Sequence, residues 1–256
     1  MAKPLSGRWL RKREVVLALG AGALAASGAA LVLEVNEDGE AMAQAAPAEE
    51  RTYEVGEFER ISTSGSQDVE IAFGETHSVR AEGAVGRLEV LVENGELIIR
   101  PRGGGWDGSD VDSTTLYVTL PRLTQVSLNG PGEISIDKVV SPRFSAMLNG
   151  GDIEVNGLEV DEAEFTINGP GEIAAAGTAR ATRVTINGPG ELQAGDLHSQ
   201  TAAVAVRGPG DVELAVEQEA EVSVEGPGEV DIDGPARCTV TTSGAGSVSC
   251  SGAEDD

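Results

Sequence analysis

The sequence predicts an all-β fold, a single-stranded right-handed parallel β-helix with about 19 residues per coil. The first observation is a glycine turn, typified by Asn168-Gly-Pro-Gly-Glu172, that recurs through the second half of the chain. The second is an alternation of apolar and polar residues on both sides of the turns, which is typical of strands with one buried face. The third is composition, because 34 glycines argue against a helical bundle.

The repeated turn has seven copies, and each is identified by its second glycine. These glycines are Gly132, Gly151, Gly171, Gly190, Gly210, Gly228 and Gly246, at intervals of 19, 20, 19, 20, 18 and 18 residues. A row of hairpins is an alternative, because tight glycine turns usually connect hairpins. Equivalent positions repeat the same side-chain size from copy to copy, which favours stacked coils.

The residues before the first repeat predict an N-terminal cap that contains a β-hairpin. Strands are expected at 53–61, 69–73 and 78–81, and the hairpin at 88–100 turns on Asn94-Gly95. A loop rich in glycine and acidic residues follows at 102–112. Because a solenoid needs its end covered, we expect these elements to cover it.

The N-terminus predicts export. An uncharged run at 15–33 follows the basic residues Lys3, Arg8, Arg11, Lys12 and Arg13. A basic flank before an apolar run is typical of a signal peptide, and this run is also long enough for a membrane anchor. Both interpretations of residues 1–45 stay open. The expected location is the periplasm or the cell surface, with residues 15–33 as the anchor if they are retained.

The charge restricts the partners that the protein can have. The chain has 18 Lys and Arg against 43 Asp and Glu, a net charge of -25 at pH 7. Nucleic acid is excluded as a partner, because binding to it begins with the neutralisation of phosphates. Membrane contact is expected only through the N-terminal segment. Residues 46–52 are the expected linker, 53–251 the β-helix domain and 252–256 an acidic tail.

Several motifs resemble one known family. They are Phe58-Glu-Arg-Ile61, Gly65-Ser-Gln-Asp68-Val-Glu-Ile71, Asn94-Gly-Glu-Leu-Ile-Ile99, and Tyr117-Val-Thr-Leu-Pro121-Arg-Leu123 leading into Val126-Ser-Leu-Asn-Gly-Pro-Gly132. Together they resemble the auto-transporter adhesin head domain, called the GIN domain, over residues 53–251. The resemblance implies a right-handed β-helix and a role as a surface adhesin.

An acidic residue follows the second glycine in six copies of the turn. These residues are Glu133, Asp152, Glu172, Glu191, Asp211 and Glu229. Stacked coils would place neighbours about 5 Å apart, at a cost of about 0.8 kcal/mol per pair in bulk-water dielectric. The column is either a solvated edge that keeps the turns soluble or a weak Ca²⁺ site between coils.

No residue pattern predicts catalysis. His77 and His198 stand among polar neighbours, and neither cysteine has a spacing typical of metal sites. We therefore expect no catalytic residue, metal or cofactor. Trp106 and Tyr117 are candidates for contact with a sugar, and Trp106 is alternatively a plug for the end of the solenoid.

The two cysteines predict a disulfide in the last coil. Counting in twos places Cys238 and Cys250 on the inward face of opposing arms, and an oxidising location permits the bond. Two separately buried thiols are the alternative.

Taken together, the sequence predicts an exported, non-enzymatic β-helix with an adhesion or envelope-interaction role. Its ligand would be a glycan or a protein of the surface or envelope. The first alternative is an acidic spacer or scaffold of the envelope. The second alternative is a β-helix enzyme that processes polysaccharides.

Overall fold

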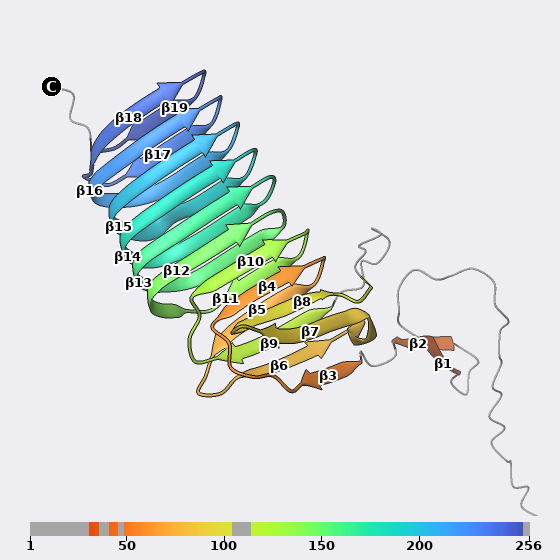
Figure 1. The fold of residues 1–256 in the computed structure, drawn as a ribbon. Helices are drawn as coiled ribbons and strands as arrows, with labels where there is room; N and C mark the ends of the chain where they lie inside the picture. Colours follow the sequence, from red (N-terminus) through yellow and green to blue (C-terminus); the bar gives the residue numbers. More distant parts are fainter. Residues whose placement is uncertain (1–30, 36–40, 46–48, 104–113, 253–256) are drawn as a thin grey trace, which may run out of the picture.

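The computed structural model describes residues 31–35, 41–45, 49–103 and 114–252 (Figure 1). Most of the described chain winds into a parallel β-helix of about seven turns with about 19 residues per turn, which confirms the predicted fold class. The strands of the repeats are β10 (Gln125–Asn129), β11 (Glu133–Ile136), β12 (Val139–Leu148), β13 (Asp152–Asn168), β14 (Glu172–Asn187), β15 (Glu191–Arg207), β16 (Asp211–Glu225), β17 (Glu229–Asp233), β18 (Arg237–Ser243) and β19 (Ser247–Cys250).

Side chains alternate between the interior and the surface along these strands. Ile167 in β13 is fully buried, whereas the next residue, Asn168, is exposed. Ile167 lies in register with Leu148 of β12 and with Ile186 of β14. Similar apolar side chains therefore stack on one another from coil to coil, and this stack is the hydrophobic core.

The N-terminal part of the domain combines parallel and antiparallel strands. Its elements are β3 (Glu50–Tyr53), β4 (Arg60–Ser64), β5 (Asp68–Phe73), β6 (Ser78–Glu82), the 3₁₀ helix η1 (Val85–Arg87), β7 (Leu88–Glu93), β8 (Glu96–Pro101) and β9 (Thr115–Leu120). Strands β7 and β8 form the hairpin predicted around Asn94-Gly95. Strand β6 pairs antiparallel with β9, and β3 pairs antiparallel with β6. These antiparallel strands cover the end of the solenoid.

Three of the strands expected in the cap, β4, β5 and β8, form two further coils of the solenoid together with β9. Strands β4 and β5 pair in parallel with β10 and β11 on one side and with β8 and β9 on the other. The orange β4 and β5 lie inside the stack in Figure 1. Counted from the N-terminal end of the stack, β8 and β9 form the first coil, β4 and β5 the second, and β10 and β11 the third. The chain therefore forms the second coil before the first. In this order Ile61 is the strand neighbour of both Val126 and Leu97.

The strand expected at 53–61 is also wrong as a continuous element. Strand β3 ends at Tyr53 and β4 begins at Arg60. Strand β3 lies on the antiparallel edge beside β6, whereas β4 lies within the parallel stack. The chain between them has to cross from one sheet position to the other, which a single strand cannot do.

Two short strands precede the domain. Strands β1 (Leu31–Val35) and β2 (Ala41–Ala45) pair antiparallel in a small sheet of their own. Most of the expected signal or anchor segment, including nearly all of 15–33, lies outside the described residues. Strand β3 begins within the expected linker 46–52, and most of the tail 252–256 is again outside. Within the described ranges, no helix is long and apolar enough to cross a membrane.

Successive turns stack backbone on backbone. The amide N–H of Asp152 donates to the carbonyl of Gly132 at 3.2 Å, and that of Glu172 donates to Gly151 at 3.3 Å. A Cβ atom at Gly171 would lie 2.1 Å from the carbonyl oxygen of Gly151, and Gly171 has a φ of +124°. The second glycine of the repeat is therefore required by the close approach of two turns.

We expect Gly171→Ala to lower the free energy of unfolding by roughly 2–4 kcal/mol, since it combines left-handed strain with a backbone clash. Gly56→Ala is the matched control, because nothing lies within 4 Å of a Cβ atom there. The control should change stability by less than about 0.5 kcal/mol. Urea unfolding of both variants measures the difference, and equal losses would contradict the stacking argument.

A disulfide links Cys238 in β18 to Cys250 in β19, with the two Cα atoms 6.6 Å apart. The bond joins the two strands of the last coil, whose side chains are more exposed than those of earlier coils. It closes a loop with a sequence separation of 12 residues. By restricting the unfolded chain, the bond stabilises a coil that has a neighbour on one side only within the described residues.

Thiol titration tests this bond in the purified, denatured protein. Without reductant we expect no free thiol, and after reduction we expect both cysteines to react. Reduction should lower stability by roughly 3 kcal/mol, as the chain-entropy model gives for a short loop. Two reactive thiols in unreduced protein from an oxidising compartment would show that the bond is absent.

Candidate functional site

An asparagine ladder runs along one side of the repeated turn. Nδ2 of Asn149 donates to Oδ1 of Asn129 at 2.7 Å, and Asn168 donates to Asn149 at 3.1 Å. Nδ2 of Asn187 donates in the same way to Oδ1 of Asn168 at 2.9 Å. The ladder ends at Arg207, which occupies the next position in register. Because each amide bonds to the coil before it, the ladder holds the turns in register.

The predicted acidic column lies on the other side of the turn. The six residues are in register from coil to coil: Glu133, Asp152, Glu172, Glu191, Asp211 and Glu229. The structure adds Asp68 at the start of β5, beside Glu133. Sequence analysis missed Asp68 because Ser66-Gln67 replaces Pro-Gly in its turn. The signal was Gly65 followed three residues later by an acid, as in the other copies.

The pKa of Glu172, at the centre of the column, is raised. Burial raises the pKa of Glu172, and the carboxylates of Glu191 and Asp152 raise it further. Glu172 is partly buried, whereas the other members of the column are exposed. Some of the charge is balanced locally, since Asp152 Oδ1 accepts a hydrogen bond from the backbone N–H of Glu172 at 3.1 Å. The carboxylates at the centre of the column thus repel one another.

The geometry of the column does not form a Ca²⁺ cage. In the described part of the chain, no group of three or more His, Cys, Asp or Glu side chains is arranged to hold a metal ion. The carboxylates form a single file along the solenoid. A calcium site needs six to eight oxygen ligands around one point, which a single file does not supply.

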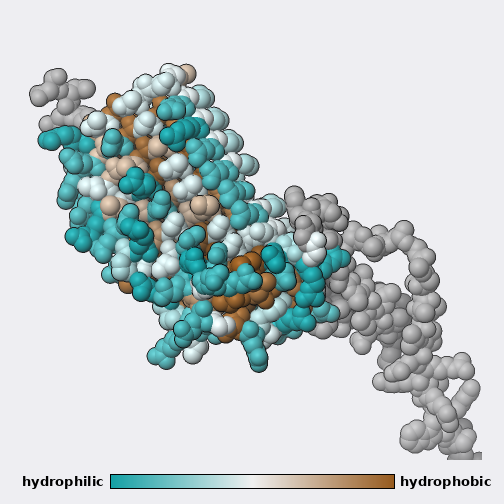
Figure 2. Space-filling model, viewed as in Figure 1, coloured by the Kyte–Doolittle hydropathy of each residue, from teal (hydrophilic) through white to brown (hydrophobic). Residues whose placement is uncertain are grey.

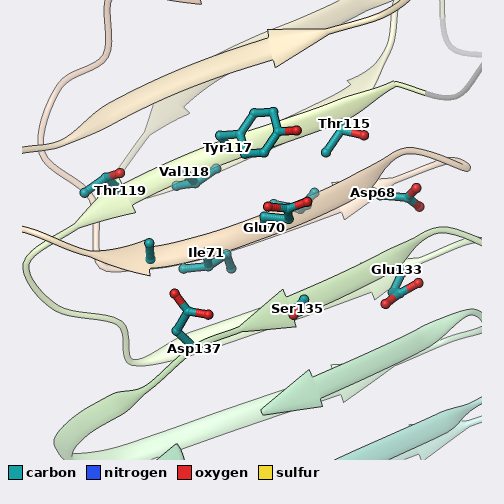
Figure 3. A pocket seen from close by; sticks show the side chains of 12 residues that line it. Asp68, Glu70, Ile71, Thr115, Tyr117, Val118, Thr119, Glu133, Ser135 and Asp137 are labelled. Atoms are coloured by element: carbon teal, nitrogen blue, oxygen red, sulfur yellow. The ribbon is translucent and has the colours of Figure 1, made fainter. Parts of the chain in front are cut away.

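A groove of about 360 Å³ crosses β9, β5 and β11 near the N-terminal end (Figure 3). Its polar lining consists of Asp68, Glu70, Thr115, Thr119, Glu133, Ser135 and Asp137. Tyr117 also lines it and points to the same side of the sheet as Glu70 in Figure 3. The groove therefore offers carboxylates, hydroxyls and one aromatic ring on a single face.

Tyr117 is fixed in place by an arginine from the antiparallel cover. The guanidinium of Arg80 in β6 lies 4.3 Å from the centre of the Tyr117 ring. Glu82 and Glu50 form ion pairs with Arg80, raise its pKa and hold its guanidinium in place. This cation–π contact orients the ring beside the groove. Sequence analysis singled out Tyr117 but gave no reason to connect it with β6.

The other residues singled out from sequence do not join this groove. Trp106 lies outside the described residues. His77 packs its ring against Phe58 with the ring centres 4.9 Å apart, and Nε2 is 2.9 Å from the Phe58 carbonyl. His77 is therefore partly buried in the cap instead of fully solvated, whereas His198 is exposed on β15. The two histidines are held on different parts of the solenoid.

Figure 2 shows apolar side chains between hydrophilic ones along the coils and a larger apolar patch at the N-terminal end near β7. Val90 and Val92 of β7 are partly buried and pack against the core. The groove and this apolar end lie at the same end of the solenoid, where the antiparallel strands cover it.

The fold and its outward-facing ladders define a protein of the β-solenoid class. The chain belongs to the family described as "Putative auto-transporter adhesin, head GIN domain", whose model matches residues 57–236. This confirms the family resemblance found in the sequence. A comparison with curated protein sequences finds no match.

Solved structures share the fold at low identity. A putative adhesin from Bacteroides fragilis has a TM-score of 0.74 at 19% identity, over 79% of this chain and 96% of that one. A putative lipid binding protein from Parabacteroides distasonis has a TM-score of 0.65 at 19% identity, over 79% and 96%. A putative adhesin from Parabacteroides merdae has a TM-score of 0.63 at 18% identity, over 79% and 95%.

We expect Glu172→Gln to stabilise the protein at neutral pH, by less than about 1 kcal/mol. A carboxyl group whose pKa is raised by folding stabilises the folded state only while it is protonated. That contribution is lost as the pH rises through its raised pKa. The gain from Glu172→Gln should therefore shrink towards zero as the pH falls below the ordinary range for glutamate, about 4.3. Urea midpoints at both pH values measure it.

Glu162→Gln is the control, because Glu162 forms an ion pair with Arg143 instead of facing other acids. This substitution should give no gain at neutral pH. Added Ca²⁺ should raise the midpoint no more than Na⁺ at the same ionic strength. A Ca²⁺-specific rise that Glu172→Gln plus Glu191→Gln abolishes would contradict the solvated-edge interpretation.

Proposed function

We propose that the protein is exported and acts without catalysis as an adhesin-type domain that binds a neutral glycan at the cell surface or envelope. The family and several neighbours of the same fold carry the name of putative adhesins. The basic flank and apolar run of the N-terminus support export. The net charge of -25 supports a ligand that carries no acidic groups.

The observation that carries this proposal is the groove beside Tyr117. Tyr117 combines an apolar ring with a hydroxyl group, and Arg80 fixes its position. Glu70 and Asp68 supply carboxylates that accept hydrogen bonds from sugar hydroxyls, and Thr115 supplies a hydroxyl group. The same carboxylates repel anionic sugars. An open strip of polar groups with one aromatic ring suits a sugar chain that lies along the sheet.

The sheet also provides a rigid support for such a ligand. Apart from Asp137, which follows β11, the lining residues come from β5, β9 and β11, and β5 pairs in parallel with both of the other strands. Their inward neighbours Val69, Val118 and Ile134 are buried in the core. The groove is therefore preformed, and binding costs little ordering of the chain.

A binding screen against neutral and acidic glycans and against whole cells tests the function. We expect binding to neutral glycans, with a loss of at least about tenfold in Tyr117→Ala, which removes the ring. Met147→Ala is the control, because Met147 is a 37% exposed side chain outside the groove lining. The control should bind as the unmodified protein does, and the urea midpoints should show that both variants are folded.

Other outcomes distinguish the alternatives. A protein that binds nothing in the screen would be an envelope spacer, and cleavage of a polysaccharide would indicate an enzyme. Preferential binding of acidic glycans or of a protein would also overturn the proposal. Cell fractionation tests export separately, and recovery of the full-length chain in the cytosol would contradict that part.

A further inference from the structure

Asparagine is followed directly by glycine at six places in the chain. The pairs are Asn94-Gly95, Asn129-Gly130, Asn149-Gly150, Asn156-Gly157, Asn168-Gly169 and Asn187-Gly188. In such a pair the glycine nitrogen can attack Cγ of the asparagine, because glycine has no side chain that hinders the approach. The side-chain amide is then lost as ammonia. Whether a pair reacts depends on whether other contacts keep these two groups apart.

The asparagine ladder keeps them apart in the turns of the repeats. Nδ2 of Asn149, Asn168 and Asn187 donates to Oδ1 of the asparagine one coil earlier, so each amide is directed towards a neighbouring coil. Two of the attacking nitrogens are engaged as well, since the N–H groups of Gly169 and Gly188 donate to backbone carbonyls at 3.0 and 2.9 Å. Attack requires these hydrogen bonds to break first.

The pair Asn156-Gly157 lies inside the long strand β13. Side chains of a strand stand roughly perpendicular to the sheet, whereas the next backbone nitrogen continues along the strand. Reaction at this pair therefore requires the chain to leave its extended conformation. Together with the ladder, the strand leaves Asn94-Gly95 as the pair that the stack does not restrain.

Asn94 and Gly95 form the two-residue turn between β7 and β8. Their φ angles are +51° and +73°, as in the tight turns that favour this dipeptide. Both residues are exposed. Over the ranges that the structure describes, neither the Asn94 side chain nor the Gly95 N–H has a hydrogen-bond partner. The electrophile and the nucleophile are therefore both free to move.

Arg60 contacts the peptide group that would react. Its Nη2 donates to the carbonyl oxygen of Asn94 at 2.6 Å, and the nitrogen of this peptide bond is that of Gly95. A charged donor on the oxygen stabilises the anion that forms when the nitrogen loses its proton. The turn also lines a hollow of about 520 Å³ with Glu59 and His77, which leaves room for water.

We infer that Asn94 is a site of spontaneous deamidation promoted by Arg60, and that the ladder protects the repeats from the same reaction. The Gly95 nitrogen gives its proton to hydroxide and forms a bond to Cγ of Asn94. The bond from Cγ to Nδ2 then breaks, and Nδ2 takes a proton from water and leaves as ammonia. Water opens the resulting imide at Cγ to give aspartate, or at the backbone carbonyl to give isoaspartate.

The reaction changes the hairpin at the end of the solenoid. Both products add a negative charge between Glu93 and Glu96, which face each other at the end of the hairpin ladder. Isoaspartate also adds a methylene group to the backbone of a two-residue turn. The outermost coil thereby acquires a more acidic edge than the chain has when it is first made.

Peptide mapping by mass spectrometry tests the inference on the full-length chain, incubated at mildly alkaline pH. We expect Asn94 to deamidate at least about tenfold faster than Asn149, Asn168 and Asn187. Arg60→Gln should slow the reaction at Asn94 at least about threefold, because the charged donor is lost. Arg100→Gln is the matched control, since Arg100 pairs with Glu89 on the same hairpin and should leave the rate unchanged.

Asn149→Ala tests the protection by the ladder. It removes the donor to Oδ1 of Asn129, so Asn129 should deamidate at least about threefold faster while Asn94 keeps its rate. In concentrated urea the rates at the six pairs should approach one another. Urea midpoints check that each variant is folded under the conditions of incubation.

Three results would overturn the inference. The first is an Asn94 that reacts no faster in the folded chain than the ladder residues do. The second is an equal effect of Arg60→Gln and Arg100→Gln, and the third is an unchanged rate at Asn129 in Asn149→Ala. None of these measurements involves a glycan, so the result is independent of the proposed function.

Discussion

Direct backbone contact between glycine turns sets the register of the solenoid. The carbonyls of Gly132 and Gly151 accept hydrogen bonds from the next coil, at a distance that leaves no room for a Cβ atom at Gly171. This contact fixes each coil against its neighbour in one register. The asparagine ladder, the apolar core and the acidic column all follow from that register, because equivalent residues of every coil are brought into line.

The same alignment that stabilises the core concentrates the negative charge. Some acidic side chains form ion pairs with basic side chains of the neighbouring coil, as in the pairs Lys138–Glu159 and Arg180–Asp161. The strands β5, β9 and β11 contain no Lys or Arg. Farther along the same acidic column, burial and then the carboxylates of Glu191 and Asp152 raise the pKa of Glu172. Charge is thus separated by face, and the candidate groove lies on the acidic one.

The two ends of the solenoid differ in how they are covered. Antiparallel strands cover the N-terminal end, and their charged residues protect the outer edge from pairing. At the C-terminal end, no strand among the described residues covers β18 and β19, which are joined by a disulfide. The two ends of the solenoid therefore differ, and the groove and the last coil lie at opposite ends.

The coil length, the inward and outward faces and the acidic column could be predicted from the sequence, because equally spaced turns such as the one at Gly171 carry this information locally. It also identified the turn of the hairpin at Asn94-Gly95. The three-dimensional structure was needed to place β4 and β5 between the outermost coil and the repeats, and to show that Arg80 packs on Tyr117. Alternation shows which face of a strand is buried but not which strand lies beside it, and that choice depends on contacts between residues far apart in the chain.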